Sequence, residues 1–254
     1  MDDAKLYRME LFQIALAEKV IRISCFEEKS REYCQDFIVS DDIPFDFDIS
    51  IAKEDLAFEA KKAEKEGVYA SIELTAIYRK IVERLLDDDI LLFHCSAVEI
   101  EGKAFLFAAP SGTGKSTHVH LLRSYLGEDK VSYINDDKPL IKVTENGCTV
   151  YGTPWNGKER LSNNISAPLG GIALLSRAKE NSITQLTKED AYPGLIVQTY
   201  RPSDPIKLIK TLSMLDHMIS YAPIYSLSVN MDIEAAKTSY EGMVRRLEER
   251  KGYA

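Results

Sequence analysis

Two residue types that often mark function are scarce in this chain of 254 residues, which has four cysteines and four histidines. The cysteines are Cys25, Cys34, Cys95 and Cys148. They form no C-x-x-C pair, and no cysteine–histidine cluster has the spacing of a zinc site. We therefore expect free thiols in a reducing compartment, with neither a disulfide framework nor structural zinc.

Long apolar runs and a basic excess are also missing. No stretch approaches the roughly 20 apolar residues that span a bilayer, and the start, MDDAKLYRMELF, carries acids where a signal peptide has basic residues. We therefore expect a cytoplasmic protein. The 32 basic residues are outnumbered by 40 acidic ones, giving a formal net charge of -8. This balance favours neither nucleic acid nor an anionic membrane as a partner, and it leaves a homo-oligomer open.

The first part of the chain is predicted to be a β-rich N-terminal portion over residues 1–70, with an uncertain boundary near 70. KVIRISCF and DFIVS are rich in strand-forming residues, and FDFDISIA alternates so that Phe45, Phe47, Ile49 and Ile51 would face one side. The charged stretch FEAKKAEKEG has no clean period, and we interpret it as an exposed segment.

Residues 71–254 mix helical and strand patterns, which predicts an α/β domain. SIELTAIYRKIVERLLDDD has helical spacing. LLFHCSAVEI and KAFLFA are two strand patterns joined by a turn at Glu101-Gly102, and Asn146-Gly147 predicts a second hairpin. Residues 186–222 are predicted to be mostly helical. Asp232 is placed as the cap of a last helix that would carry Leu247 on its buried face.

The segment SGTGKST lies between an apolar strand pattern and an amphipathic helix, THVHLLRSYL, the context that a phosphate-binding loop requires. Its two glycines permit left-handed backbone conformations, so that successive N–H groups can surround phosphate oxygens. Lys115 would reach the β- and γ-phosphates, and the Ser116 hydroxyl would bind magnesium. The predicted nucleotide-binding residues are Ser111, Gly112, Thr113, Gly114, Lys115, Ser116 and Thr117.

The entrance to this loop departs from the usual pattern, because Ala109 stands where the first glycine is expected and Pro110 follows it. Proline has no N–H and favours extended geometry at the residue before it. We expect an extended entry, with the left-handed conformations at Gly112 and Gly114.

Three further segments carry candidate side chains. YINDD places Asp136 and Asp137 at the end of a strand, where two acids can share metal binding and proton abstraction or simply form a solvated turn. His94, in FHCSAV, is placed on a strand beside the loop strand, as a catalyst or as a core residue. GTPWNGKERLSN carries Lys158 and Arg160, which could neutralise phosphate or remain solvated.

A few other basic residues are weaker candidates. Arg177 and Arg201 are interpreted as surface or structural residues. His118 follows the loop on its helix and could approach the nucleotide, whereas His120 is interpreted as a packing or surface residue.

Together, FHCSAVEIEGKAFLFAAPSGTGKST, NDD and GTPWNGKERLSNNISAPLGGIALLSR resemble the HPr kinase/phosphorylase catalytic domain and the wider phosphoenolpyruvate-carboxykinase-like superfamily. The last piece resembles small HPr-kinase-related proteins associated with peptide-modification systems. The resemblance implies a mixed β-sheet wrapping a P-loop with flanking helices, in a catalytic domain over residues 71–254. It also implies a kinase that uses ATP and magnesium and acts on a hydroxyl.

The same resemblance implies roles for individual residues. It suggests a catalytic function for His94, Asp136 as the base and Asp137 as a metal ligand beside Ser116, with the two aspartates exchangeable. The distal signature of true HPr kinases is missing, so HPr is not the expected substrate.

Four functions remain open on the sequence alone. The leading hypothesis is a kinase that phosphorylates Ser or Thr of a peptide or protein, with Lys115 and Lys158 or Arg160 holding the transferred group. A kinase acting on a small-molecule hydroxyl is the second hypothesis. A nucleotide-gated module that binds a peptide without transfer, and a simple NTPase switch, are the others.

Overall fold

The computed structural model describes residues 9–66 and 71–245. Contacts within the chain divide the protein into two compact units, Met1–Leu85 and Leu86–Ala254. The boundary expected near residue 70 falls at residues 67–70, outside the described residues. The division follows helix α3 (Ile72–Leu85), because this helix packs on strands β2 (Lys19–Cys25) and β4 (Phe47–Ser50) of the first unit.

The first unit contains a four-stranded sheet in the order β3-β1-β2-β4. Strand β1 (Glu10–Leu16) forms an antiparallel hairpin with β2, and β3 (Ile38–Val39) pairs with β1. Buried and exposed side chains alternate along β4, and Phe47 and Ile49 are buried as expected. Phe45 departs from it: the residue remains 38% exposed, and its ring lies 3.8 Å from the Arg22 guanidinium carbon.

Helices form more of the first unit than the sequence predicts. Besides α1 (Glu28–Tyr33) and α3, helix α2 runs over Lys53–Glu66 and includes most of the stretch interpreted as an exposed segment. The described part of this stretch is mostly exposed, as expected, but its helix was not predicted. FEAKKAEKEG shows little amphipathic period, whereas its alanine, glutamate and lysine residues have high intrinsic helix propensity. The helix is also tied to α3, since Arg79 Nε donates to Glu59 Oε1 at 2.5 Å.

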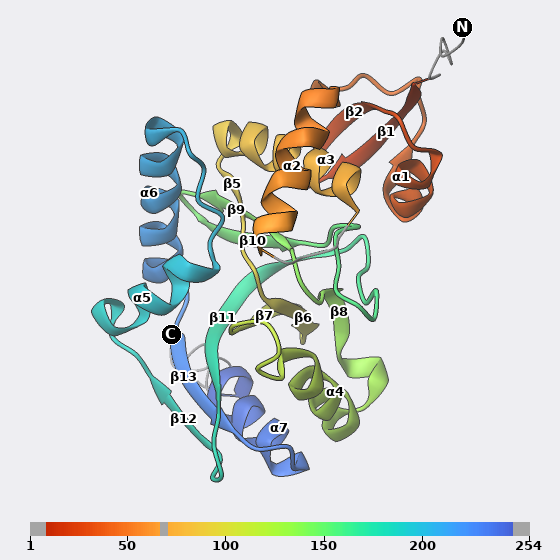
Figure 1. The fold of residues 1–254 in the computed structure, drawn as a ribbon. Helices are drawn as coiled ribbons and strands as arrows, with labels where there is room; N and C mark the ends of the chain where they lie inside the picture. Colours follow the sequence, from red (N-terminus) through yellow and green to blue (C-terminus); the bar gives the residue numbers. More distant parts are fainter. Residues whose placement is uncertain (1–8, 67–70, 246–254) are drawn as a thin grey trace, which may run out of the picture. The chain divides into compact units, whose positions relative to one another are not determined.

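The second unit contains a nine-stranded mixed sheet, so the predicted α/β class with a mixed sheet is confirmed (Figure 1). The long strand β11 (Ser166–Arg177) pairs antiparallel with β10 and parallel with β7 and β13. The remaining bounds are β5 (Ile90–Leu92), β6 (Ser96–Ile100), β7 (Lys103–Ala108), β8 (Ser132–Asn135), β9 (Leu140–Thr144), β10 (Gly147–Tyr151), β12 (Ser182–Gln185) and β13 (Ile224–Val229).

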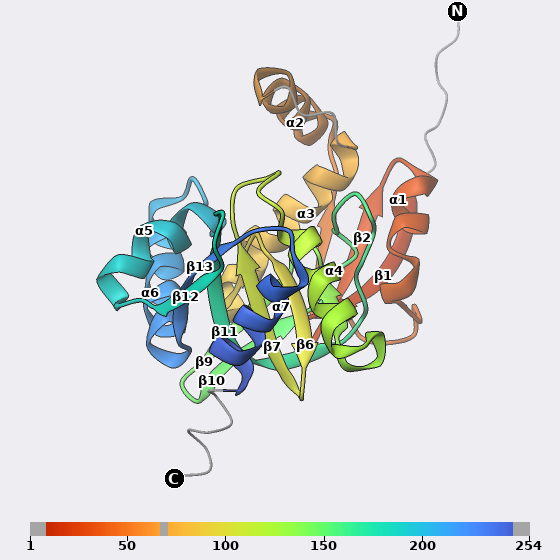
Figure 2. The same cartoon turned by 90° about the horizontal axis from the view of Figure 1, so that it is seen from below.

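Helices cover both faces of this sheet. Strand β7 alternates, with Leu106 in one buried apolar cluster and Phe105 and Phe107 in another. The first cluster is completed by α5 (Lys188–Gln198) and α6 (Pro205–Tyr221). The second is completed by α4 (Lys115–Leu126) and α7 (Ile233–Ser239), which Figure 2 shows on the same side of β6 and β7.

Several local predictions are confirmed and others are corrected. The expected hairpin of β9 and β10 forms, with Glu145 and Asn146 in the turn and Gly147 as the first residue of β10. LLFHCSAVEI is not one strand: it breaks between β5 and β6, so His94 lies in the break. Asp232 occupies the position before α7, but its side chain makes no capping hydrogen bond. The expected contact of Leu247 lies outside the described residues.

The remaining short elements are one-turn 3-10 helices and one π-helical turn. The 3-10 helices are Gln35–Phe37, Leu86–Asp88 and Glu128–Lys130, and the π-helical turn is Tyr240–Arg245. All four cysteines are buried free thiols. No helix among the described residues combines the length and apolar character required to cross a bilayer.

Candidate functional site

The predicted phosphate loop connects the end of β7 at Ala108 to the start of α4 at Lys115. Gly112 has a φ of 78° and Gly114 a φ of 116°, so both glycines take the left-handed conformations expected of them. Among the described residues, the structure records no acceptor for the N–H groups of the first turn of α4, at Lys115, Ser116 and Thr117. Free N–H groups at a helix start make this loop suitable for an anion.

The Lys115 side chain lies inside the loop rather than in solvent. The residue is 8% exposed, and its Nζ donates to the Ala109 carbonyl oxygen at 2.9 Å. The residue that replaces the usual first glycine therefore supplies a backbone partner for the lysine. Burial lowers the pKa of Lys115, and the charge of Asp137 opposes that shift.

Lys115, His94 and Asp137 come together beside the loop. Lys115 Nζ lies 3.5 Å from His94 Nε2, and His94 Nε2 lies 3.0 Å from Asp137 Oδ1. Burial tends to raise the pKa of Asp137, but the hydrogen bond from His94 and the charge of Lys138 outweigh it and lower the pKa to about 2. Asp137 is therefore an ionised carboxylate at neutral pH.

Gln198 orients the His94 ring, a role that the sequence analysis missed. His94 Nδ1 lies 2.9 Å from Gln198 Oε1, and the His94 backbone N–H donates to the Gln198 carbonyl oxygen at 2.8 Å. The amide oxygen of Gln198 and the carboxylate of Asp137 thus contact the two ring nitrogens of His94 and fix the plane of the ring. Gln198 is the last residue of α5 and lies far along the chain from His94. The only signal in the sequence that could have indicated its role is that it is polar at the end of the apolar run GLIVQ.

Asn135 fixes the geometry of the double aspartate. Its Oδ1 accepts hydrogen bonds from the N–H groups of Asp137 at 2.8 Å and Lys138 at 2.6 Å. Its Nδ2 donates to the carbonyl oxygens of Thr153 at 3.0 Å and Trp155 at 3.2 Å. One fully buried amide therefore joins the NDD turn to the TPWNGK loop, since it satisfies backbone groups on both.

Asp136, the first aspartate of this turn, is 4% exposed. Its Oδ1 accepts a hydrogen bond from the Gly157 N–H at 2.5 Å. Burial raises the pKa of Asp136 and the Asp137 charge adds to the rise, while the hydrogen bond from Gly157 opposes it. The pKa values of two adjacent carboxylates are thus moved in opposite directions.

The loop that binds Asp136 carries the two predicted basic residues. Lys158 and Arg160 are both exposed on this loop. The cluster of His94, Lys115 and Asp137 is formed by residues from other segments. The neighbouring Glu159 accepts a hydrogen bond from His120 on α4 at 2.6 Å. His120 thus links the first helix after the phosphate loop to this segment.

Arg177 contributes more to the site than the sequence analysis predicts. It lies at the end of β11, and its Nε donates to the Thr113 carbonyl oxygen at 2.9 Å. Its Nη2 donates to the carbonyl oxygen of Gly112. The guanidinium therefore holds the backbone of the phosphate loop in place while the loop N–H groups remain available.

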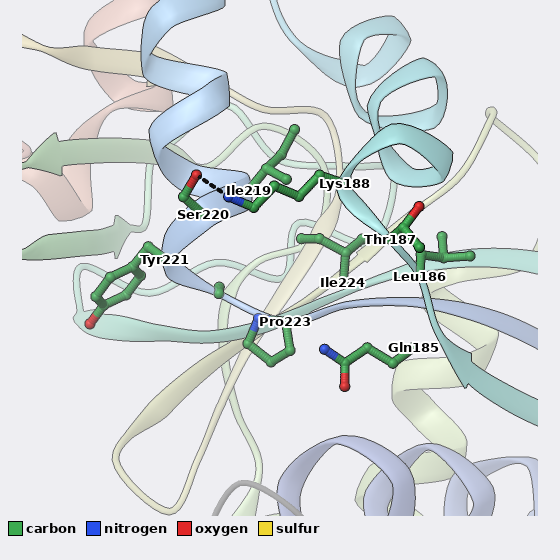
Figure 3. Close-up of a pocket in the computed structure, with 10 residues that line it drawn as sticks. Gln185, Leu186, Thr187, Lys188, Ile219, Ser220, Tyr221, Pro223 and Ile224 are labelled. Atoms are coloured by element: carbon green, nitrogen blue, oxygen red, sulfur yellow. Dashed lines mark hydrogen bonds between the residues drawn. The ribbon is translucent and has the colours of Figure 1, made fainter.

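Cavities of the second unit occur beside the phosphate loop and between α5 and α6. One, of about 330 Å³, adjoins the phosphate loop at Thr113, Gly114 and Thr117 and extends to the ends of β11 and β13. The other, of about 290 Å³, lies between the start of α5 and the end of α6, where Lys188 Nζ donates to Ser220 Oγ at 2.9 Å (Figure 3). The second cavity shares no residue with the phosphate loop or the His94 cluster.

The predicted magnesium ligands fit that ion chemically. Ser116 and Asp137 offer a hydroxyl and an ionised carboxylate oxygen, and Mg²⁺ is commonly held by one or two protein oxygens together with substrate phosphates and water. The described residues contain no group of three or more His, Cys, Asp or Glu side chains able to hold a metal by themselves.

Comparisons with known proteins add little. No family model matches the chain, and no curated protein sequence matches it. Among solved structures, the HPr(Ser) kinase/phosphatase from Coxiella burnetii is similar, with a TM-score of 0.35 and 10% sequence identity. The match covers 63% of this chain and 98% of that one. At this level of similarity it bears on neither activity nor substrate.

Proposed function

We propose that this chain is a kinase that transfers the γ-phosphoryl group of ATP to a hydroxyl, with Ser or Thr of a peptide or protein as the leading acceptor. The observation that carries the proposal is the pair Asp136 and Asp137, whose pKa values are moved in opposite directions, with Asp137 joined through His94 to the lysine of the predicted phosphate loop. Such a split separates a proton acceptor from a permanently charged group.

The loop residues bind and position the donor. The N–H groups at the start of α4 surround phosphate oxygens, and Lys115 exchanges its bond to the Ala109 carbonyl for the β- and γ-phosphates. Arg177 keeps the loop in shape through Gly112 and Thr113. In this scheme the donor phosphates lie next to His94 and Asp137.

Asp136 is the proposed base. Its carboxylate takes the proton of the acceptor hydroxyl as the hydroxyl oxygen bonds to the γ-phosphorus, and the bond from that phosphorus to the bridging oxygen breaks to leave ADP. Its raised pKa makes it a better proton acceptor than Asp137. Lys158 or Arg160 would move from solvent to the transferred group.

Magnesium, held by Ser116 and Asp137, would neutralise charge that develops on the phosphates. His94 holds one oxygen of Asp137, and Gln198 fixes the His94 ring, so the carboxylate keeps one orientation. Lys138, at 2.9 Å from Asp137 Oδ2, has a side chain 44% exposed and can turn away from that oxygen. His94 is in this scheme a positioning residue close to the transferred group.

The test is an acceptor screen with the full chain, magnesium and ATP labelled on the γ-phosphorus. The acceptors are peptides with a single Ser or Thr and a panel of small hydroxyl compounds. We expect label on a peptide, and a loss of at least about 10³-fold in Lys115→Ala. Lys103→Ala, at the far end of β7, is the matched control and should retain the rate.

The other functions give different products in the same screen. Label on a small hydroxyl compound alone would keep the kinase and replace the peptide acceptor. Labelled inorganic phosphate without a labelled acceptor would indicate an NTPase switch. Bound but intact ATP would indicate a nucleotide-gated binding module, and either of these last two results would overturn the kinase proposal.

A further inference from the structure

His118 is a buried histidine that the proposed reaction does not use. It lies on α4, is 2% exposed, and packs against Phe107 with ring centroids 4.9 Å apart. Its Nδ1 is buried and has no hydrogen-bond partner within the described chain. Because a buried polar atom without a partner is costly, this atom calls for an explanation.

The neighbouring bonds determine which ring nitrogen carries the proton. His118 Nε2 lies 2.9 Å from Ser239 Oγ, and the Ser239 hydroxyl donates to the Ala236 carbonyl oxygen at 2.9 Å. Since the hydroxyl proton is used there, Ser239 Oγ accepts from His118, and Nε2 carries the hydrogen. The neutral ring then presents Nδ1 as a bare acceptor.

The same side chain lines the cavity of about 330 Å³ beside the phosphate loop. Loop residues form one end of this cavity, and apolar side chains form its walls together with Arg177 and Asn230. None of His94, Lys115 and Asp137 lines it. A molecule whose phosphates lie on the loop would extend into it. The apolar walls, which suit the faces of a ring, are Leu121, Leu175, Ala178, Val229 and Met231.

We propose that this cavity takes the nucleoside of the phosphate donor, and that His118 Nδ1 accepts a hydrogen bond from an N–H or O–H group of that nucleoside. The inference rests on the proposed nucleotide function and assigns the specificity of the same site. Nδ1 is closed off from water, so a ligand reaches it only when a lining side chain moves. Met231, which is 77% exposed, is free to do so.

Binding is measured by calorimetry with the full chain. The probes are ATP, inorganic tripolyphosphate, purine riboside triphosphate, which lacks the base amine, and the 2′-deoxy and 3′-deoxy forms of ATP. We expect ATP to bind more tightly than tripolyphosphate, and one of the three analogues to bind about tenfold more weakly than ATP. The analogue that loses affinity identifies the base amine or a ribose hydroxyl as the donor.

His118→Gln removes the Nδ1 acceptor and leaves a side-chain N–H group able to reach Ser239. We expect this variant to bind ATP about tenfold more weakly, to bind tripolyphosphate as the wild type does, and to treat ATP and the selected analogue alike. His217→Gln, the same change on α6 at the opposite face of the sheet, should bind all probes as the wild type does. Thermal unfolding of each variant checks that it folds. The comparison of ATP with its analogues uses the wild type alone, so it tests the inference even if a variant fails to fold.

Equal binding of ATP and all three analogues would overturn the inference and leave the phosphate loop intact. An equal loss of tripolyphosphate and ATP in a folded His118→Gln would also overturn it, because the effect would then act on the loop. If the wild type bound neither ATP nor tripolyphosphate, the nucleotide function would fail as well. Failure of phosphoryl transfer with these affinities retained would affect only the kinase proposal.

Discussion

The backbone nitrogen of Gly157 lies 2.5 Å from Oδ1 of Asp136, and a Cβ atom on residue 157 would lie 2.7 Å from Oδ2 of the same carboxylate. Residue 157 therefore has no room for a side chain while Asp136 keeps its position. The glycine of TPWNGK and the first aspartate of NDD are thus joined by one close contact. It holds the proposed base through a backbone N–H group.

Gly157→Ala should move the Asp136 carboxylate and reduce phosphoryl transfer by about 10²-fold, since a displacement of about 1 Å near the reacting atoms has an effect of that size. Nucleotide affinity should change less than threefold, because the phosphate loop is untouched. Gly171→Ala is the control, since a Cβ there meets only ordinary contacts from 3.5 Å outward. Single-turnover rates and calorimetric affinities separate the two effects, and an unchanged rate in Gly157→Ala would contradict the assignment of Asp136.

Asp136→Asn should reduce transfer by about 10³-fold or more, because an amide keeps the shape of the side chain but cannot take the acceptor proton. Binding of ATP should remain within a few-fold of the wild type. Asp137→Asn should instead weaken the magnesium dependence of binding, as expected for a metal ligand. If Asp136→Asn shifted the magnesium titration and Asp137→Asn did not, the roles of the two carboxylates would be exchanged.

Much of the second unit could be predicted from the sequence because its elements carry strong local signals. The conformation of the glycine loop before α4, the flanking strand and helix, and the β9–β10 hairpin depend on glycine conformations and on hydrophobic period, both of which are local. The mixed sheet was predicted from the family resemblance and not from local sequence patterns. Nothing local distinguishes β11 as the strand that pairs with three others.

The missed features depend on contacts between distant residues. His94 was placed within a strand, whereas it lies in a break where Gln198 binds both its ring and its backbone. Arg177 was interpreted as a surface or structural residue, but its contact with the loop was not predicted because the carbonyl groups that it binds become neighbours only after β11 pairs with β7. Helix α2 was missed because its signal is intrinsic propensity rather than period.

Arg177→Ala should loosen the phosphate loop and weaken ATP binding about tenfold, because two hydrogen bonds to loop carbonyl groups are lost. The side chain is exposed, so the melting temperature should change little. Arg201→Ala, at another exposed arginine, should leave the affinity unchanged. Tripolyphosphate binding should fall in parallel with ATP binding in Arg177→Ala; a loss restricted to ATP would place the residue in nucleoside recognition instead.

Asp55 gives the first unit a predictable acid response. Burial tends to raise the pKa of Asp55, but the hydrogen bonds and charges of Lys80 and Arg79 outweigh it, so the pKa is lowered on folding. Its stabilisation is therefore complete above the unfolded value of about 4 and is lost as the pH falls through the lower folded value. Asp55→Asn should cost on the order of 2 kcal/mol at pH 7 and less at pH 3.

Hydrogen exchange of residues 9–66 in the full chain, at pH 7 and pH 3, would measure this difference. Asp48→Asn, at an exposed position of β4, is the control and should change neither value. A loss of stability in Asp55→Asn that is the same at both pH values would show that packing, and not charge, is responsible.

Ala109→Gly tests whether the unusual loop entrance is a defect. The buried Ala109 supplies only its carbonyl oxygen to Lys115, and glycine supplies the same group. The left-handed conformations lie at Gly112 and Gly114, so a third glycine adds backbone freedom that the loop does not require. We therefore expect ATP affinity within about threefold of the wild type and a loss of stability of about 0.5–1 kcal/mol. A gain of orders of magnitude in affinity would instead mean that the alanine restrains phosphate binding, and would favour the nucleotide-gated binding module over the kinase.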